Sequence, residues 1–302
     1  MSGISTNRSD ITLPSEISSE ILQKTQQSSA IMQLARQVSL PGRGLTIPVI
    51  TGDPSASWVS ETAAKPVSNP SLSTKLMEGY TLAVIVPFSK QFTRDMRALY
   101  DVLVSRLPNA LGLKFDQTVI GAVAKPGANF DNFAGCTAQS LVPTAPKTVY
   151  GSLVAAFTDI AENGYALDGF GLSPAAQGIL LGAADNDGRP LFINSAADGA
   201  IPRILGARTL MNRGLYKSGQ AAGASDSGSP AIVGVAGDWT QAMYGIVEGI
   251  SVTWADQATL PIGSDDVNLF VHNMVAVRAE IEIGFRAQTA AFNLLTGAVP
   301  QA

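Results

Sequence analysis

The sequence predicts a mixed α+β fold, and three observations predict it. The stretch VAVRAEIEIGF (275–285) alternates strictly between apolar and polar residues, as a half-buried strand does. Residues 96–123 carry an apolar residue at every fourth position over about seven turns, which is typical of a long amphipathic helix. Residues 147–265 switch repeatedly between helical and strand patterns.

The composition describes a folded chain with few charges. Of its 302 residues, 46% are hydrophobic and 15% are charged, which excludes an intrinsically disordered protein. A surface with so few charges favours burial against partners, and therefore an assembly. The net charge of −4 and the pI near 5.0 argue against a dedicated nucleic-acid binder, which presents a basic face.

The sequence shows no targeting or membrane segment. Its N-terminal stretch lacks the apolar segment of a signal peptide, and no stretch reaches the roughly 18 to 20 apolar residues that a membrane span requires. We therefore expect neither export nor membrane insertion, and a cytoplasm-like compartment.

Residues 1–40 form a polar arm with two short amphipathic stretches. Six apolar residues fall at helical spacing: Ile17, Ile21, Leu22, Ile31, Leu34 and Val38. Because so polar an arm gains little by folding alone, we expect it to bury its apolar atoms against other chains.

An extended hairpin is predicted next. Strand patterns at 42–50 and 80–88 enclose a long excursion rich in Ser, Thr, Pro and Ala, with Trp58 and Val59 as its apolar exceptions. A hairpin with so little core of its own is marginal in isolation, so it should lie on a neighbour.

The helices and strands that follow are marked by their ends. Pro108 should kink the 96–123 helix or split it in two. The remaining pattern predicts, in order, a helix at 148–165 ended by Asn163-Gly164, a strand at 167–173, a helix opened by Pro174, and a strand at 231–237.

Catalytic and metal-binding motifs are not evident. Cys136 is the only cysteine and His272 the only histidine, a poor supply for zinc or nucleophilic chemistry. The loop Asp185–Pro190 resembles the opening of a calcium loop but lacks its spaced ligands, so we interpret it as a turn. We expect no catalytic residue, no cofactor and no metal.

Several collinear segments resemble the major capsid proteins of tailed bacteriophages, which have the Hong Kong 97-type fold. They span about residues 13–296 and include WVSE followed by AAKP, the helix leading into DGRPL, GDWTQAMYGI, and the closing VAVRAEIEIGF. The resemblance implies an N-terminal arm, an extended loop that overlaps an adjacent subunit, a peripheral domain with a long spine helix, and an axial domain. Their expected bounds are 1–40 for the arm, 52–88 for the loop, 41–51 with 89–124 and 266–302 for the peripheral domain, and 125–265 for the axial domain.

The resemblance also implies a structural function. Identical chains would close into pentamers and hexamers of an icosahedral shell around double-stranded DNA, which an acidic chain should contact only weakly. The expected location is the virion capsid, assembled in the host bacterial cytoplasm. The expected partners are a separate scaffolding protein, a portal and decoration proteins.

Two alternatives stay open. An encapsulin-like bacterial compartment would use the same fold to enclose enzymes. A soluble α+β hydrolase would use Ser227 and His272.

In some capsids of this family, a lysine on the extended loop bonds covalently to an asparagine of a neighbouring subunit, assisted by a glutamate. Asn273 and Glu280 match the acceptor and glutamate positions here. The donor position falls on Thr62, and Lys65 lies three residues further on, about 10 Å along an extended chain. We therefore expect no cross-link between Lys65 and Asn273.

Overall fold

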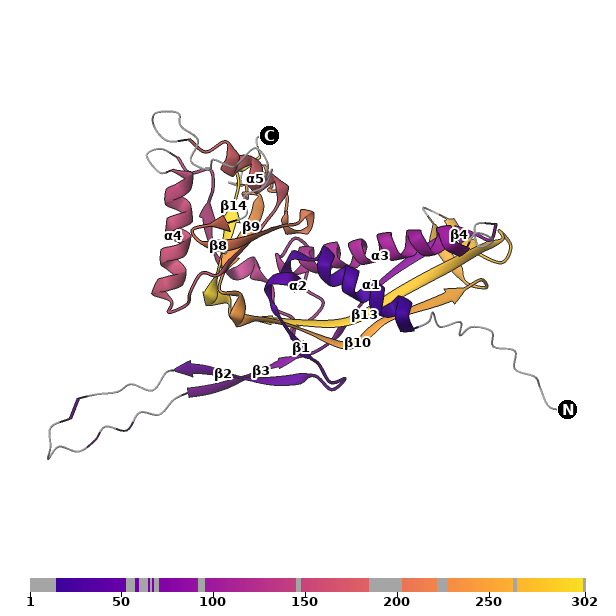
Figure 1. Cartoon of the computed structure of the whole chain (residues 1–302), viewed down its shortest axis with the longest axis horizontal. Helices are drawn as coiled ribbons and strands as arrows, with labels where there is room; N and C mark the ends of the chain where they lie inside the picture. Colours follow the sequence, from indigo (N-terminus) through magenta and orange to yellow (C-terminus); the bar gives the residue numbers. More distant parts are fainter. Residues whose placement is uncertain are drawn as a thin grey trace.

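The computed structural model describes residues 15–52, 58–59, 65, 67, 71–91, 96–144, 148–184, 203–221, 228–262 and 265–300. Figure 1 shows an elongated lobe and a compact lobe that meet at an angle, and a thin hairpin that extends away from both. The two lobes contain separate sheets, of four and six strands.

The elongated lobe is a four-stranded sheet with helices packed on it. The strand order is β1-β10-β13-β4; β1 is parallel to β10 and the other pairs are antiparallel. Buried residues of the helices and the sheet form one cluster that includes Ile21, Leu107, Ile250, Val277 and Ile281. The elements are α1 (Ser15–Ser28), α2 (Ala30–Leu34), β1 (Arg36–Ser39), β4 (Tyr80–Ser89), α3 (Met96–Val119), β10 (Ala242–Ala255), β11 (Thr259–Ile262), β12 (Asp265–Asn268) and β13 (Met274–Ala287).

The compact lobe is a six-stranded sheet in the order β5-β14-β9-β6-β8-β7. Buried residues of its two helices, among them Leu153, Ala156 and Leu180, form one cluster with Phe170 and Leu295 of the sheet. The elements are β5 (Thr137–Ser140), α4 (Val149–Glu162), β6 (Gly169–Leu172), α5 (Pro174–Leu181), β7 (Arg203–Ile204), β8 (Ala207–Met211), β9 (Ile232–Gly237) and β14 (Phe292–Thr296).

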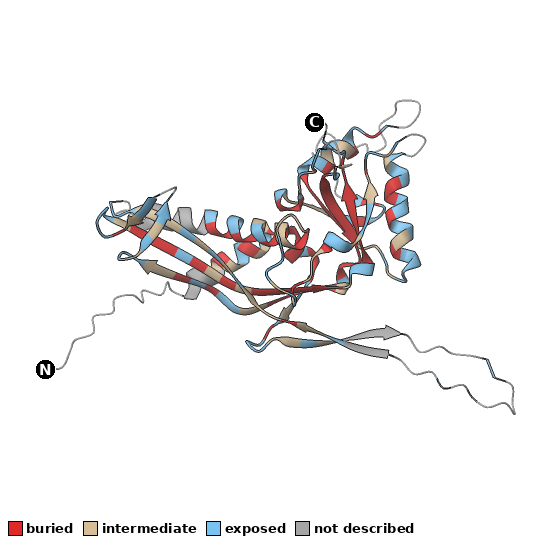
Figure 2. Cartoon of the chain, turned by 180° about the vertical axis from the view of Figure 1, so that it is seen from behind, coloured by how far each residue is buried: buried red, intermediate tan, exposed pale blue. Residues whose placement is uncertain are grey.

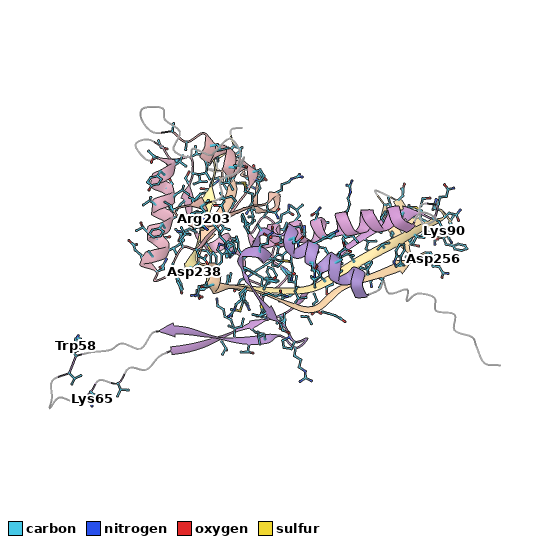
Figure 3. All side chains as sticks on the ribbon, viewed as in Figure 1. Trp58, Lys65, Lys90, Arg203, Asp238 and Asp256 are labelled. Atoms are coloured by element: carbon cyan, nitrogen blue, oxygen red, sulfur yellow. The ribbon has the colours of Figure 1, made fainter. Side chains whose placement is uncertain are left out.

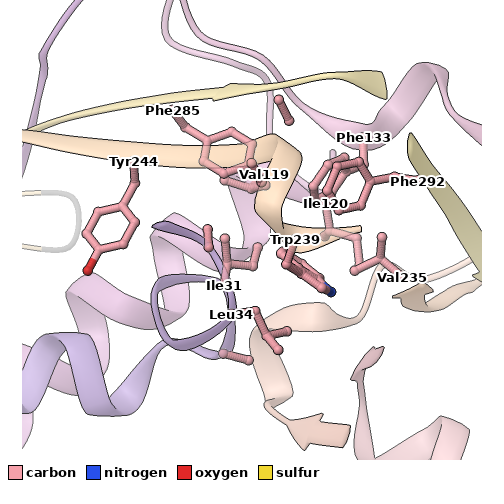
Figure 4. Packing of buried hydrophobic residues seen from close by; sticks show 14 of the residues in the cluster. Ile31, Leu34, Val119, Ile120, Phe133, Val235, Trp239, Tyr244, Phe285 and Phe292 are labelled. Atoms are coloured by element: carbon pink, nitrogen blue, oxygen red, sulfur yellow. The ribbon is translucent and has the colours of Figure 1, made fainter. Parts of the chain in front are cut away.

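Aromatic side chains fill the junction between the lobes. Phe133, Trp239, Phe285 and Phe292 come from four separate segments and are all buried (Figure 4). The ring centroids of Phe133 and Phe292 lie 4.6 Å apart, and those of Trp239 and Phe292 lie 5.2 Å apart. The ring of Phe133 also lies 5.7 Å from that of Phe285. Since β13 carries Phe285 and β14 carries Phe292, Phe133 joins the two sheets to each other.

The extended hairpin is confirmed, but its predicted second strand is wrong. Strand β2 (Leu45–Gly52) pairs with β3 (Ser71–Met77), whereas β4 pairs with β13 from Tyr80 to Ser89. Burial explains the difference. Alternate residues of β4 pack onto the buried cluster of the elongated lobe, whereas the hairpin has no core in which these side chains could be buried.

Most of the other predicted helices and strands are present. The helix predicted at 96–123 is α3, which ends four residues earlier, at Val119, and Pro108 does not split it. Ser173 caps α5, with Pro174 in its first turn, and Gly164 follows α4 with a φ of 83°. The strands predicted at 167–173, 231–237 and 275–285 are β6, β9 and β13.

The expectation that the arm buries its apolar atoms against other chains is wrong for its described part. Ile21, Ile31 and Leu34 are buried within this chain, because α1 lies on α3 and β10, and α2 lies on β6 and β8 of the compact lobe. Val38 belongs to β1 rather than to a helical turn. Residues 1–14 and the turn expected at Asp185–Pro190 lie outside the described residues.

Candidate assembly surfaces

Among the described residues, the side chains with reactive groups are not gathered into one site. His272 is exposed in the turn before β13, and Ser227 lies outside the described residues. Burial raises the pKa of the Cys136 thiol to about 12, so this thiol is protonated at neutral pH and a poor nucleophile. Among the described residues, no three side chains of His, Cys, Asp or Glu could hold a metal ion together.

None of the described helices is both long and apolar enough to cross a bilayer.

Large exposed apolar side chains lie at opposite extremes of the molecule. Trp58 is fully exposed and Val67 is 86% exposed beyond the hairpin strands, while Phe270 and Val271 are 71% and 70% exposed in the turn between β12 and β13. Figure 3 shows Trp58 and Lys65 at one end, and Lys90 and Asp256 at the other. Such side chains on a protruding end indicate contacts with other molecules.

A buried guanidinium fixes the base of the extended hairpin to the body. Arg286, near the end of β13, is 8% exposed. Its Nε donates to the carbonyl oxygen of Leu76 at 2.8 Å, Nη1 to Asp131 Oδ1 at 2.7 Å, and Nη2 to Asn129 Oδ1 at 2.9 Å. We call these four residues the arginine node. Because Leu76 belongs to β3, the node sets the direction in which the hairpin leaves the body.

A buried carboxyl joins the arm helices to α3. Asp116 Oδ1 lies 2.5 Å from Ser29 Oγ, and its Oδ2 accepts a hydrogen bond from the backbone N–H of Ala30 at 3.0 Å. The N–H of Ile31 lies 3.4 Å from Oδ1. Asp116 therefore caps the N-terminus of α2 from a different helix. Burial raises the pKa of Asp116 to about 7, although these three hydrogen bonds lower it.

The three residues considered for a cross-link lie apart within one chain. Lys65 is exposed at the hairpin end, whereas the carbonyl oxygen of Asn273 accepts a hydrogen bond from the N–H of Lys90 at the opposite end. Glu280 lies seven residues further along β13, roughly 20 Å from Asn273, and forms an ion pair with Arg278 at 3.0 Å. Within a single chain, Lys65 and Asn273 therefore lie too far apart to form a bond.

The sequence profile of the Phage capsid family matches residues 10–297. The chain belongs to this family. A relative named "Probable major capsid protein gp17" from Mycobacterium phage L5 is 30% identical over 292 residues, which cover 90% of this chain and 85% of the relative. The protein of the same name from Mycobacterium phage D29 is 29% identical over 95% of this chain and 90% of its own length.

Solved structures show that the capsid protein shares its fold with distant relatives. A chain from Mycobacterium phage Cain superposes with a TM-score of 0.70 at 23% identity, over 90% of this chain and 91% of that one. A chain of the structure titled "Capsid of native GTA particle computed with C5 symmetry" gives a TM-score of 0.60 at 18% identity, over 90% and 91%. At such identities the likeness establishes the fold alone.

These comparisons confirm the resemblance and the mixed α+β fold. The capsid protein is a structural subunit of a phage virion shell and not an enzyme. The hydrolase alternative with Ser227 and His272 is not supported. The sequence did not reveal the arginine node or the Asp116 cap, since each joins residues far apart in the chain.

Proposed function

We propose that this protein is the major capsid subunit of a tailed phage, with a Hong Kong 97-type fold, and that it closes into pentamers and hexamers of an icosahedral shell around double-stranded DNA. The observation that carries the proposal is the extended hairpin with fully exposed Trp58 beyond its strands. A two-stranded ribbon without a core of its own is stabilised when it lies on another subunit.

The two lobes support an assignment of the family's domains. We assign the compact lobe to the axial domain, and the elongated lobe, with α3 as spine helix, to the peripheral domain. Sheet membership supports boundaries that differ from the expected ones. Strand β10 pairs with β13, which supports its assignment to the peripheral domain, while β14 pairs with β5 and β9, which supports its assignment to the axial domain. The extended loop then runs from Leu45 to Met77.

Assembly of such a shell would involve further partner proteins. A separate scaffolding protein, a portal and decoration proteins would act on it during assembly in the bacterial cytoplasm. The DNA inside would be contacted weakly, because a chain with a net charge of −4 offers few cations to phosphates.

Electron microscopy of the purified protein, and of particles from an infected host, tests this proposal. We expect closed icosahedral shells that hold nucleic acid in the particles. Shells that enclose protein and no nucleic acid would indicate an encapsulin-like compartment instead. A protein that stays monomeric under every assembly condition would contradict the proposal.

Removing residues 54–78 should separate folding from assembly. We expect a subunit that still folds but forms no stable shells, because no residue of the excised segment belongs to the buried clusters of either lobe. Loss of the buried Met77 side chain and of the Leu76 carbonyl of the arginine node should lower its stability. Circular dichroism and sedimentation measure the two properties. A deletion variant that assembled like the intact chain would refute the extended-loop assignment.

We predict that mature particles are held together without covalent bonds between subunits. The reason is the position of Lys65, three residues beyond the expected donor position at Thr62. Denaturing gel electrophoresis should give one band near 31.4 kDa. A ladder of oligomers that disappears in Lys65→Ala or Glu280→Ala would show that the bond forms after all.

A further inference from the structure

Two arginines face each other at the edge of the six-stranded sheet. Strand β7 is the last strand of that sheet, and its Arg203 is the register partner of Arg208 on β8. The side chains of such a pair lie on the same face of the sheet, with Cβ atoms about 4.5–5.5 Å apart, and two like charges in this arrangement are destabilising. The central strands of the lobe are buried (Figure 2), whereas both arginines are exposed.

A two-residue turn holds this pair together. Leu205 and Gly206 join β7 to β8 with φ values of 50° and 82°, which is the left-handed geometry of a tight hairpin turn. This geometry is common for glycine but unfavourable for leucine. The hairpin therefore lowers the stability of the free subunit through its turn and through its paired charges, and a bound anion would remove the second effect.

The arm brings a third arginine to the same place. Arg208 Nη2 donates to the carbonyl oxygen of Leu34, the last residue of α2, at 3.0 Å. Arg36 is exposed at the start of β1, and two residues along the chain place its Cα atom within about 7 Å of that of Leu34. We call Arg36, Arg203 and Arg208 the guanidinium cluster. Its members come from the arm, β7 and β8, so folding alone gathers them.

The guanidinium cluster has little negative charge around it. Within the described part of the chain, none of its members forms an ion pair with a carboxylate. Asp168 is close enough for Arg208 to act on it: burial raises the pKa of Asp168, and the charge of Arg208 opposes this shift. Asp168 Oδ1, however, accepts a hydrogen bond from the backbone N–H of Trp239 at 2.9 Å. The cluster therefore carries an excess of positive charge that an anion from outside the chain would balance.

Guanidinium groups bind phosphate through two parallel hydrogen bonds, and DNA phosphates are the anions that the proposed shell encloses. We propose that the guanidinium cluster binds the phosphate backbone of the enclosed double-stranded DNA. This inference rests on the proposed function, and it assigns to one part of the surface the weak contact expected of an acidic chain. Because such a contact involves phosphates alone, it does not depend on base sequence.

The salt dependence of binding tests the cluster in the unassembled subunit. Fluorescence anisotropy measures the affinity for a short labelled DNA duplex at several salt concentrations. Three phosphate contacts give a slope of log K against log salt of about −2.7. Replacement of the whole cluster by glutamine should remove this slope. The matched control replaces Arg43, Arg106 and Arg213, which are exposed elsewhere, and removes the same charge. An equal loss of slope in the control, or no loss in the cluster variant, would overturn the proposal.

A single substitution guards against a general effect on folding. Arg203→Gln keeps the hydrogen bond between Arg208 and Leu34 and should reduce the magnitude of the slope by about 0.9. Without DNA, this variant should also unfold at a higher temperature, because it removes the repulsion between the paired arginines. An unchanged slope or a lower thermal midpoint would show that Arg203 serves the fold and does not bind DNA.

Particles distinguish DNA from a protein that covers the cluster. Phenylglyoxal modifies exposed arginines, and mass spectrometry measures its rate at Arg203 in DNA-filled particles and in the same particles after osmotic release of their DNA. We expect several-fold slower modification while DNA is present. Equal rates, or protection that persists after release, would overturn the proposal and leave the proposed function intact. A failure of the unsubstituted chain to form shells that contain DNA would refute the proposed function itself.

Discussion

Replacing Arg286 by leucine should lower the free energy of unfolding of the unassembled subunit by about 3 kcal/mol. The substitution leaves Asp131 without its guanidinium partner and the carbonyl of Leu76 without its donor. Loss of one partner of a buried ion pair costs about 3–5 kcal/mol. We expect the lower end, because Asp131 keeps 19% of its side chain exposed and has Lys75 at 3.9 Å. Urea unfolding followed by circular dichroism measures the change.

The control for this prediction is Arg278→Leu on the same strand. Arg278 and Glu280 form an ion pair at 3.0 Å, but their side chains are 48% and 28% exposed, and pairs this exposed contribute about 0–1 kcal/mol. Arg286→Leu should also make the hairpin base more susceptible to limited proteolysis, since the guanidinium joins β3 to β13. Equal effects of the two substitutions would mean that the arginine node has no special role.

The second large effect concerns pH and Asp116. Burial raises the pKa of this carboxyl from 3.8 to about 7. Between these two pH values, the carboxyl is therefore protonated in the folded chain and ionised in the unfolded chain. Stability contributed by this group is therefore greatest below about pH 4 and falls as the pH rises to about 7. At about 1.4 kcal/mol per pH unit, the subunit should be about 2 kcal/mol less stable at pH 8.5 than at pH 5.5.

Asp116→Asn tests this prediction. The amide keeps the shape of the protonated carboxyl and does not titrate, so the free energy of unfolding of this variant should lack that 2 kcal/mol loss. Asp256→Asn, at an exposed position, should keep the pH dependence of the unsubstituted chain. Chemical denaturation at the two pH values measures all three proteins. Parallel pH profiles for Asp116→Asn and the unsubstituted chain would refute the role of Asp116.

Prediction from the sequence succeeded where a local pattern decides the structure. The alternation in β13, the four-residue spacing in α3, and the Ser173-Pro174 start of α5 each correspond to an element with nearly the predicted bounds. It failed where pairing depends on distant partners. The pattern at 80–88 indicates a strand but not that its partner is β13, and the polar composition of the arm conceals residues that α3 buries.

Sequence reasoning was least informative about the candidate site. Arg286 falls on the polar side of an alternating strand, and only the crossing of β3 above it makes that position buried. Asp116 is one acidic residue in a long helix, and it is the start of α2, with Ser29 87 residues away in the chain, that packs against its carboxyl. No local pattern marks either residue.

The position of β14 within its sheet has a consequence for biosynthesis. This strand, Phe292–Thr296, lies between β5 and β9 rather than at an edge, and its parallel pairing with β5 joins Asn293 to Thr137. A ribosome must therefore translate through about Thr296 before the six-stranded sheet can close. Contacts between such distant segments form slowly. A nascent chain thus lacks a finished compact lobe, so premature polymerisation on the ribosome is disfavoured until synthesis has passed this strand.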